Sequence, residues 1–365
     1  MKIVTVIGAR PQFIKASVVS QALHNYPNIS EIIIHTGQHF DHNMSAIFFE
    51  DMKIPQPKYH LNINSLSHGA MTGRMLEQIE TILITERPDK VLVYGDTNST
   101  LAGALAAKKL HIPIAHVEAG LRSFNQNMPE EVNRILTDHM ADLLFAPTSC
   151  AVSNLKSEGI APSRIHYVGD VMYDAALFYA EKAEVLQNSL FSDLQIEKNN
   201  YILATVHREK NTNDRERLDK IFALLINLSE KIPVVLPLHP RTRKMLADYS
   251  IKIPDSKSFK LIDPLGYLEI LLVEKNATAI MTDSGGMQKE SYFFKVPCFT
   301  LRDETEWGEL VDLGWNTLLH LNDSIDDVDK VFSVIRSKNQ LKYVSSLYGD
   351  GHAADHIIQC LINSK

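Results

Sequence analysis

Short, mainly apolar runs alternate with longer stretches of mixed polarity along the chain. Val91–Tyr94 and Ile114–Val117 are such runs, and each is followed by a glycine or a charged residue. Runs of this length and composition indicate strands that are buried on both faces. The stretches between them, such as Ser149–Glu158, have the length and composition of helices. A repeated strand–helix order predicts parallel sheets covered by helices on both faces, so we expect an α/β protein.

The alternation of strands and helices restarts after residue 200. A chain of 365 residues is longer than those that usually fold around a single hydrophobic core, so we expect two domains. We expect a first domain at 1–170 and a second at 171–345, with the crossing inside Gly169–Asp174 and the polar stretch Asn188–Asn200. The predicted strands are Lys2–Ile7, Glu31–His35, Val91–Tyr94, Ile114–Val117, Leu143–Ala146, Ile165–Val168, Tyr201–Val206, Pro233–Leu238, Lys260–Asp263, Thr278–Thr282 and Pro297–Leu301. The predicted helices are Gly8–Leu23, Asn43–Asp51, Ser67–Thr85, Ser149–Glu158, Asp214–Leu228, Leu265–Val273 and Ala353–Ile362, with others opening at Asp96 and Pro129.

Composition excludes several classes of protein. The formal net charge is −7, which gives no general basic field for nucleic acid. Cys150, Cys298 and Cys360 are widely spaced and fit no metal-binding pattern, which favours a reducing compartment. The apolar run Ile3–Ile7 is too short for a signal peptide core, and no stretch approaches the roughly 20 apolar residues of a membrane span. We therefore expect a cytoplasmic enzyme without membrane insertion.

Three acidic residues follow predicted strands or begin predicted helices. Asp96 and Glu118 come just after strands, and Glu130 lies in the first turn of a helix that also carries Arg134. Ligands of open parallel sheets bind at the carboxyl ends of the strands. Acids gathered there acquire different pKa values, which gives one site both a proton donor and a proton acceptor. Each acid by itself could instead cap a helix or offset its dipole.

The first strand is followed by a turn that carries two cations, Arg10 and Lys15. A turn at a helix start is where α/β proteins hold phosphate, but this one has neither a dinucleotide fingerprint nor a Walker loop. The two cations could bind an anion or could be ordinary surface charges. Further on, His39, Asp41 and His42 lie in a polar loop whose spacing matches no compact metal site, so no metal is expected.

In the second half of the chain, Ser284-Gly285-Gly286 lies between a predicted strand and a predicted helix. Glycines let the backbone approach a ligand closely, and the free N–H groups of a helix start suit a diphosphate. Glu290, about one turn on, could accept the hydroxyl groups of a ribose. The same residues could form a plain tight turn. His207 follows a strand, where a polar histidine favours a functional role.

Six short motifs occur in order along essentially the whole chain. They are Gly8-Ala-Arg-Pro-Gln-Phe-Ile-Lys15, Gly95-Asp-Thr-Asn-Ser-Thr100, His116-Val-Glu-Ala-Gly-Leu-Arg122, Pro129-Glu-Glu-Val-Asn-Arg134, Thr282-Asp-Ser-Gly-Gly-Met-Gln-Lys-Glu290 and Tyr348-Gly-Asp-Gly351. Together they resemble the non-hydrolysing UDP-N-acetylglucosamine 2-epimerases. The resemblance implies two facing Rossmann-like domains in the GT-B arrangement, with residues 346–365 forming a helix that returns to the first domain. It also implies a homodimer.

The resemblance further implies conversion of UDP-GlcNAc to UDP-ManNAc without an added cofactor, as part of surface polysaccharide synthesis. In that reaction a base removes the C2 proton and UDP leaves C1. The resulting 2-acetamidoglucal is reprotonated on its other face before UDP adds back. The implied catalytic residues are Asp96, Glu118, Glu130 and His207. The implied substrate-binding residues are Arg10, Lys15, Arg134, Ser284, Gly285, Gly286 and Glu290.

Three segments depart from the usual motifs of the family. Gly8–Lys15, Gln38–Met44 and Arg302–Glu309 stand where typical members have GTRPEAIK, QHRxML and RDTTERPE. In bacterial members that their own substrate activates, the second of these segments contributes to a regulatory UDP-GlcNAc site. The variant set resembles the subgroup that acts on UDP-2,3-diacetamido-2,3-dideoxyglucuronate. UDP-GlcNAc is therefore the expected substrate, as the default of the family, and the diacetamido uronate is the alternative.

Other classes of protein share parts of this pattern. A GT-B glycosyltransferase would share the diphosphate-binding turn but would need no acids on two faces of C2. A hydrolysing epimerase would release the free sugar, and a regulator that binds nucleotide sugars would perform no chemistry. A dinucleotide oxidoreductase is disfavoured because the chain has no glycine fingerprint after its first strand.

Overall fold

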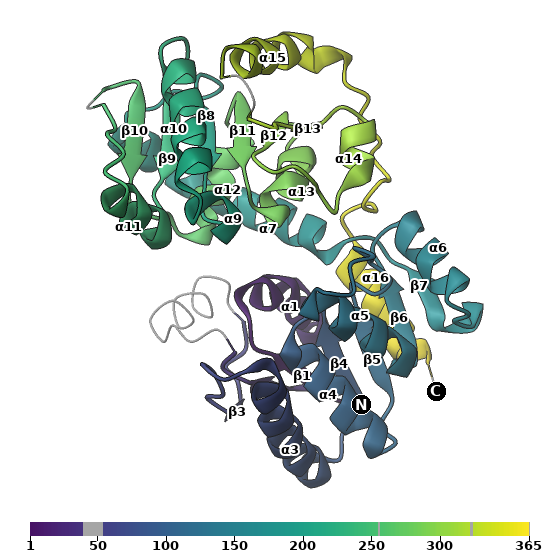
Figure 1. The fold of residues 1–365 in the computed structure, drawn as a ribbon. Coiled ribbons are helices and arrows are strands. Elements are labelled where there is room, and N and C mark those ends of the chain that lie inside the picture. Colours follow the sequence, from purple (N-terminus) through teal and green to yellow (C-terminus); the bar gives the residue numbers. More distant parts are fainter. Residues whose placement is uncertain (39–53, 255, 322–323, 365) are drawn as a thin grey trace. The chain divides into compact units, whose positions relative to one another are not determined.

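The computed structural model describes residues 1–38, 54–254, 256–321 and 324–364. The chain divides into two compact units, one formed by Met1–Ala175 with Ser345–Lys365 and the other by Ala176–Val344 (Figure 1). Each unit contains one sheet, and every pair of neighbouring strands in the described residues is parallel. This confirms the predicted α/β class.

The sheet of the first unit has the strand order β3-β2-β1-β4-β5-β6-β7 in the part of the chain that the structure describes. The direction in which strands are added reverses between β1 and β4, so the carboxyl ends of these two strands flank a topological switch point, where open α/β sheets bind ligands. The strands are β1 (Lys2–Ile7), β2 (Ser30–His35), β3 (Tyr59–His60), β4 (Lys90–Tyr94), β5 (Ile114–Val117), β6 (Leu143–Ala146) and β7 (Ile165–Tyr167).

Helices cover this sheet, and their starts follow local sequence signals. Helix α1 has Pro11 in its first turn and α5 begins at Pro129, where the missing N–H of proline costs nothing. Helix α4 is capped by the Thr97 hydroxyl, which accepts from the backbone N–H of Thr100 at 3.2 Å. The helices are α1 (Arg10–His24), α3 (His68–Glu86), α4 (Asn98–Lys109), α5 (Pro129–Met140), α6 (Ser149–Ser157) and a 3₁₀ turn at Pro162–Arg164.

The last helix, α16 (Ala353–Asn363), packs on the first unit beside α1, as expected (Figure 1). Ile357, Ile358 and Leu361 are fully buried. The backbone N–H of Ala354, in its first turn, donates to Asp174 Oδ2 at 2.8 Å. The C-terminus is therefore part of the first core although it follows the second unit in sequence.

The sheet of the second unit has the order β10-β9-β8-β11-β12-β13 among the described residues, and the direction reverses between β8 and β11. The strands are β8 (Ile202–Thr205), β9 (Val234–Pro237), β10 (Phe259–Ile262), β11 (Ala279–Thr282), β12 (Cys298–Thr300) and β13 (Asn316–Leu318). The helices are α8 (Gln187–Leu194), α9 (Glu209–Thr212), α10 (Arg215–Ser229), α11 (Pro240–Asp248), α12 (Tyr267–Lys275), α13 (Gly285–Phe293), α14 (Gly308–Asp312) and α15 (Ser324–Ser337), with 3₁₀ turns at Glu184–Leu186 and Lys338–Gln340.

The predicted strands all coincide with strands of the structure, to within a residue or two at each end. Two short edge strands, β3 and β13, were not predicted. Gly169–Asp174, where we placed the crossing, opens helix α7 (Val171–Ala183), which runs from the first unit into the second. The polar stretch that begins at Asn188 is largely helical, because it contains most of α8. The predicted helix Asn43–Asp51 lies outside the described residues.

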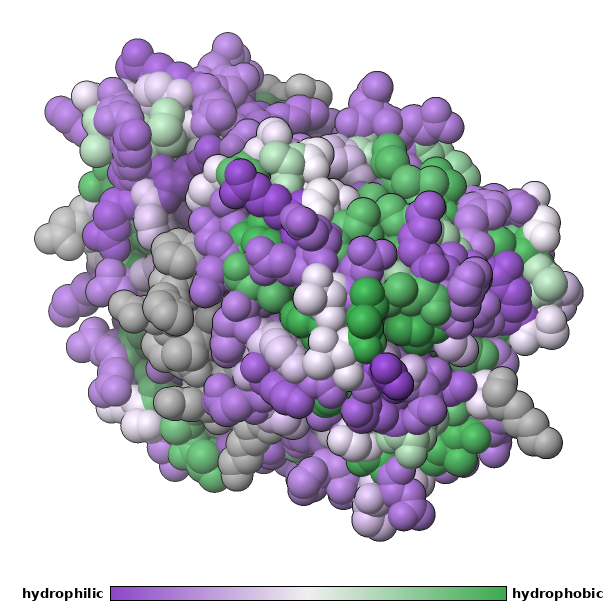
Figure 2. All heavy atoms as spheres, turned by 90° about the horizontal axis from the view of Figure 1, so that it is seen from below, coloured by the Kyte–Doolittle hydropathy of each residue, from purple (hydrophilic) through white to green (hydrophobic). Residues whose placement is uncertain are grey.

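Some large apolar side chains remain exposed, among them Phe124, Val132 and Leu136 in and before α5. Figure 2 shows hydrophobic surface (green) in patches bordered by hydrophilic residues (purple) on the face that it draws. Individually exposed apolar side chains are usual on protein surfaces. In the described residues, none of the helices has the length and apolar character needed to cross a membrane.

Candidate functional site

The carboxyl ends of β4 and β5 carry the first group of predicted site residues. Glu118 follows β5 with φ 70°, because its own N–H and that of Ala119 both donate to Phe145 O, at 3.1 and 3.0 Å. Its carboxylate forms an ion pair with Lys15 of α1, and both side chains are 11% exposed. A positive φ is uncommon for a residue other than glycine and is typical of functional sites.

The turn after β4 lies against this ion pair. Gly95 has φ 63°, and a Cβ atom there would lie 3.5 Å from Lys15 Nζ and 3.8 Å from Glu118 Oε2. Arg10, the first residue of α1, is partly buried. The structure therefore brings Lys15 and Glu118 together at the carboxyl edge of the sheet, beside Gly95, which has no side chain.

Asp96 belongs to a second ion pair at the same edge. Arg134 Nη2 lies 2.7 Å from Asp96 Oδ2, and Arg134 Nη1 lies 2.5 Å from Glu131 Oε2. The Glu131 carboxylate also accepts from the backbone N–H groups of Ser123 and Phe124, at 3.0 and 2.9 Å. Burial would raise the pKa of Glu131, but these N–H groups and Arg134 hold it below its usual value. Arg134 is thereby fixed in place with one side directed at Asp96.

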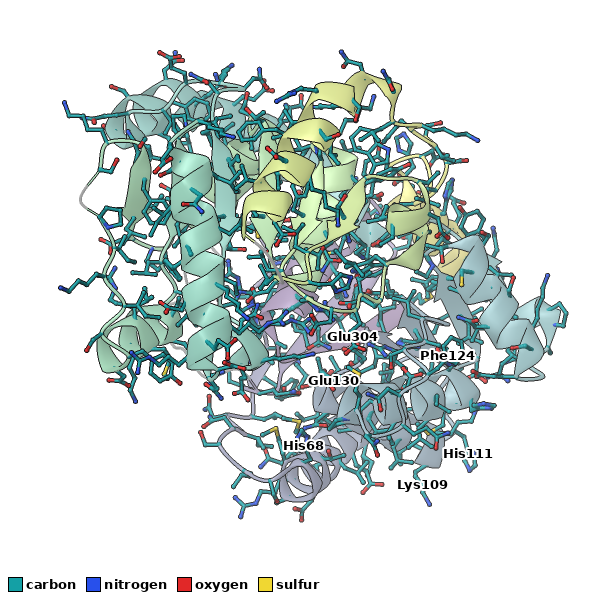
Figure 3. All side chains as sticks on the ribbon, turned by 45° about the horizontal axis from the view of Figure 1, so that its top comes forward. His68, Lys109, His111, Phe124, Glu130 and Glu304 are labelled. Carbon is teal, nitrogen blue, oxygen red and sulfur yellow. The ribbon has the colours of Figure 1, made fainter. Side chains whose placement is uncertain are left out.

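Glu131 was not among the predicted site residues, whereas its neighbour Glu130 was. Glu131 is 1% exposed and fixes Arg134 together with the chain before α5. Glu130, labelled in Figure 3, stands exposed in the first turn of α5 and takes no part in the ion pairs of Asp96 and Glu118. The sequence feature that could have identified Glu131 is its spacing from Arg134, because residues three apart lie on one face of a helix.

A buried charge network lies beneath this edge. His116 of β5 is fully buried, with Nε2 2.7 Å from Gly95 O and Nδ1 2.7 Å from Asp138 Oδ1. Arg122 Nη1, at 2.8 Å, and the N–H of Gly120, at 3.0 Å, also contact Asp138. Burial would raise the pKa of Asp138, but His116 and Arg122 hold it below its usual value. Both ring nitrogens of His116 thus lie at hydrogen-bond distance from an oxygen atom.

His116 was missed as a positioning residue, although it stands inside an otherwise apolar strand, which was the available signal. Its ring connects the carbonyl of the turn after β4 to Asp138 of α5. The turn that carries Asp96 is thus tied to the interior through the contact between Gly95 O and the buried His116 ring.

In the second unit, Asp283 organises the loop after β8. This fully buried carboxylate accepts from the backbone N–H groups of His207 and Arg208, both at 2.9 Å to Oδ2, and from Asn211 Nδ2 at 2.9 Å. His207 Nδ1 lies 3.0 Å from Asp283 Oδ1, while the imidazole remains 39% exposed. Burial would raise the pKa of Asp283, but the His207 side chain and these N–H groups hold it below its usual value. His207 is therefore oriented by a buried anion and is accessible to a ligand.

Ser284, Gly285 and Gly286 form the start of α13, as predicted. A Cβ atom on Gly286 would have ordinary room, since the nearest atoms, Glu290 Oε2 and Ser284 Oγ, would both lie 3.9 Å away. A Cβ on Gly285 would instead collide with the carboxylate of Glu306. The first turn of a helix has unpaired N–H groups that favour an anion.

Glu290 lies one turn along α13 and is largely buried. The Tyr267 hydroxyl lies 3.5 Å from Glu290 Oε1. Behind it, Glu274 of α12 is fully buried, and burial together with the charge of Glu290 raises its pKa well above the usual range. Glu274 was not predicted, because helical spacing gives no sign that an acid will be buried against a second acid.

The described residues contain no group of three or more His, Cys, Asp or Glu side chains that could hold a metal ion. His39, Asp41 and His42 of the polar loop lie outside those residues.

Comparison with known proteins places this geometry in a family. A model of the family described as UDP-N-acetylglucosamine 2-epimerase matches residues 21–362. The chain is 52% identical to a UDP-N-acetylglucosamine 2-epimerase homolog of Methanococcus maripaludis, over the full length of both chains. It is 51% identical to the UDP-2,3-diacetamido-2,3-dideoxy-D-glucuronate 2-epimerase of Pseudomonas aeruginosa, over 99% of each chain.

A solved structure supports the same family assignment. The crystal structure of Methanocaldococcus jannaschii UDP-GlcNAc 2-epimerase in complex with UDP-GlcNAc and UDP superimposes with a TM-score of 0.87, at 44% identity and over 100% of both chains. Sequence and structure both match over essentially the whole length, which confirms the resemblance of the six motifs. The chain belongs to the family of UDP-N-acetylglucosamine 2-epimerases, which are isomerases.

Proposed function

We propose that the chain is a non-hydrolysing 2-epimerase of a UDP-linked 2-acetamido sugar. The observation that carries the proposal is the gathering of ion pairs at the carboxyl edge of β4 and β5, where Lys15 meets Glu118 and Arg134 meets Asp96. Positioned carboxylates can remove a proton and return one. Inversion of a carbon centre through loss and regain of its proton requires groups of this kind.

In the proposed reaction, a carboxylate takes the proton from C2 of the sugar. The electrons of that C–H bond form a double bond between C1 and C2, and UDP leaves C1 with the electrons of the C1–O bond. The 2-acetamidoglucal then accepts a proton at C2 from the opposite face, and a diphosphate oxygen bonds to C1 again. The proposed groups for the proton steps are Asp96, Glu118 and Glu130, with His207 serving the departing diphosphate.

The start of α13 is the proposed binding place for UDP. Gly285 and Gly286 supply N–H groups of the first helical turn, and the room above Gly286 supports close approach of a phosphate. The N–H of Ser284 instead donates to Thr282 Oγ1 at 2.9 Å and holds the turn. Glu290, one turn on, is proposed to accept the ribose hydroxyls, as acids do in related folds. Arg10 and Lys15 are proposed as further cations for the diphosphate.

Two sugars are candidate substrates. The 51% identity to the diacetamidoglucuronate 2-epimerase exceeds the 44% identity to the M. jannaschii UDP-GlcNAc 2-epimerase, and the M. maripaludis relative at 52% identity is named only as a homolog of the UDP-GlcNAc enzymes. Together with the departures at Gly8–Lys15 and Arg302–Glu309, this difference favours the uronate. UDP-GlcNAc is the second candidate, since the family model and most of the relatives carry its name.

We further propose that the enzyme works in the cytoplasm as a homodimer, without an added cofactor, and supplies a sugar nucleotide for surface polysaccharide. Three cysteines without a disulfide in the described residues suit a reducing compartment. The negative net charge offers no support for nucleic acid binding.

The test is an NMR assay of the purified protein with each UDP sugar. We expect the C2 epimer of UDP-2,3-diacetamidoglucuronate to form with the diphosphate linkage intact, and little conversion of UDP-GlcNAc. Efficient, sigmoidal conversion of UDP-GlcNAc would assign that sugar instead. Release of free sugar would indicate a hydrolysing enzyme, transfer to an acceptor would indicate a glycosyltransferase, and binding of both sugars without turnover would indicate a regulator.

A further inference from the structure

The carboxylate of Glu306 lies at the start of α13, directly beside Gly285. A Cβ atom on Gly285 would meet Glu306 Oε1 before any other atom. Gly285 is the first residue of α13, where the backbone N–H groups have no partner within the helix. The dipole of the helix adds a partial positive charge at this end. Glu306 thus places a negative group at the position that favours an anion.

Two arginines converge on this carboxylate. Arg302 Nη1 lies 2.9 Å from Glu306 Oε2, and Arg208 Nη2 lies 3.9 Å from Glu306 Oε1. Arg208 Nη2 would also lie 3.7 Å from a Cβ atom on Gly285. Two guanidinium groups at a helix start carry more positive charge than one carboxylate neutralises. The charge of the two arginines matches that of a diphosphate better than that of a single carboxylate. Guanidinium groups also bind phosphate through charge-assisted hydrogen bonds.

The side chains of the residues on both sides of Glu306 are hydrogen-bonded to α13. The Thr305 hydroxyl donates to Gln288 Oε1 at 2.5 Å, and Trp307 Nε1 donates to Gly285 O at 2.9 Å. Trp307 is largely buried, whereas the Glu306 side chain is one-third exposed. Rotation of the Glu306 side chain can therefore move the carboxylate away from Gly285 while the loop keeps its anchors.

We propose that Glu306 acts as an internal anion that occupies the diphosphate position in the ligand-free protein and exchanges with the diphosphate of the substrate. This inference rests on the proposed binding of UDP at α13. When the diphosphate arrives, the carboxylate rotates away. Arg208 and Arg302 then form ion pairs with the phosphate oxygens in place of Glu306. Between turnovers the returning carboxylate neutralises the two arginines and competes with UDP, which weakens product binding.

The test compares UDP binding to the wild-type protein and to Glu306→Gln by calorimetry at fixed salt. The amide has nearly the same shape but no charge, so the competing anion is lost while the loop anchors stay. We expect the variant to bind UDP at least tenfold more tightly. Glu304→Gln is the matched control, because it removes the same charge two residues away (Figure 3) and should leave the affinity for UDP nearly unchanged. Glu306→Ala should reproduce the gain if the Gln variant does not fold.

The possible results separate this inference from the proposed function. If the wild-type protein binds UDP and the Glu306 variants bind it equally or more weakly, Glu306 is a ligand or a support of the site and the inference is overturned. An equal gain in UDP affinity in Glu304→Gln would show that any loss of negative charge in this loop strengthens binding. That result would overturn the inference as well. If neither the wild-type protein nor any variant binds UDP, the proposed UDP site itself fails.

Discussion

Glu118 combines a left-handed backbone conformation with a largely buried ion pair to Lys15. Each feature costs free energy, on the order of 1–3 kcal/mol for the backbone alone. The sequence predicted that Glu118 comes just after a strand. Its φ, however, depends on two successive N–H groups that share Phe145 O, which no local pattern encodes. The same holds for Glu131, whose burial depends on the path of the chain before α5.

Gly286 is the residue at which the proposed UDP site can be tested most simply. Gly286→Val fills the room above the first turn of α13, where a diphosphate would approach the backbone. We expect UDP affinity to fall more than tenfold, or by over about 1.4 kcal/mol, as measured by calorimetry, with little change in melting temperature.

Gly69→Val is the matched control, because Gly69 is also the second residue of its helix, α3, and a Cβ atom there would meet nothing within 4 Å. It should leave the affinity for UDP unchanged. UDP binding by Gly286→Val at the wild-type affinity would mean that the turn does not hold the diphosphate.

At the scale of elements, the site depends on how the turn after β4 is tied to α5. His116 makes that connection through Gly95 O and Asp138. Since Arg122 also binds Asp138, the network joins the ends of β4, β5 and α5 in one buried group of charges. Removing one member of a buried charged network leaves another without its partner, which destabilises strongly.

His116→Phe should therefore lower the free energy of unfolding by about 3–5 kcal/mol, measured by urea denaturation. His116→Gln retains one donor and should lose less. Free energies of unfolding equal to the wild-type value in both variants would show that the network contributes no stability.

A second element-scale contact gives a pH dependence. Burial raises the pKa of Asp174 to about 6, although the N–H groups of Ala354 and Ala353 at the start of α16 act in the opposite direction. Asp170 raises the pKa further, and His352 lowers it. Because the folded-state pKa lies above the usual 3.8, the protonated carboxyl favours the folded state at low pH. This stabilising contribution is lost as the pH rises from about 4 through about 6.

Asp174→Asn should remove this dependence, since the amide is neutral and its oxygen can still accept from Ala354. We expect the variant to gain stability relative to the wild-type protein as the pH rises from 4 to 8, by up to about 3 kcal/mol. The measurement is the difference in melting temperature at each pH. A constant difference across this range would assign the titration to other groups.

At the scale of the whole molecule, the alternating pattern was sufficient to predict two parallel sheets and the strands of their centres, but the order of those strands comes from the structure. β3 and β13 were missed because two or three residues at a sheet edge carry too few apolar positions to be distinguished from loop. We predicted that the chain passes between the domains near residue 170, but we did not predict the helix α7 that forms this passage. Gly169–Asp174 contains a glycine and two acids, which do not indicate a helix. The motifs identified acids and glycines at strand ends, whereas the buried partners His116, Asp138 and Glu274 depend on packing between distant segments.

The central claim, that carboxylates at the edge of the first sheet move the C2 proton, is tested most directly by deuterium incorporation at C2 in D₂O. The wild-type protein, started from each epimer, should place solvent deuterium at C2 in step with epimerisation. Glu118→Gln and Glu130→Gln should remain folded and retain UDP binding but lose activity by on the order of 10²-fold or more. Glu130→Gln should keep the wild-type melting temperature, whereas loss of the buried ion pair to Lys15 should lower that of Glu118→Gln. Epimerisation without deuterium at C2, or full incorporation with near-normal turnover in both variants, would contradict the account.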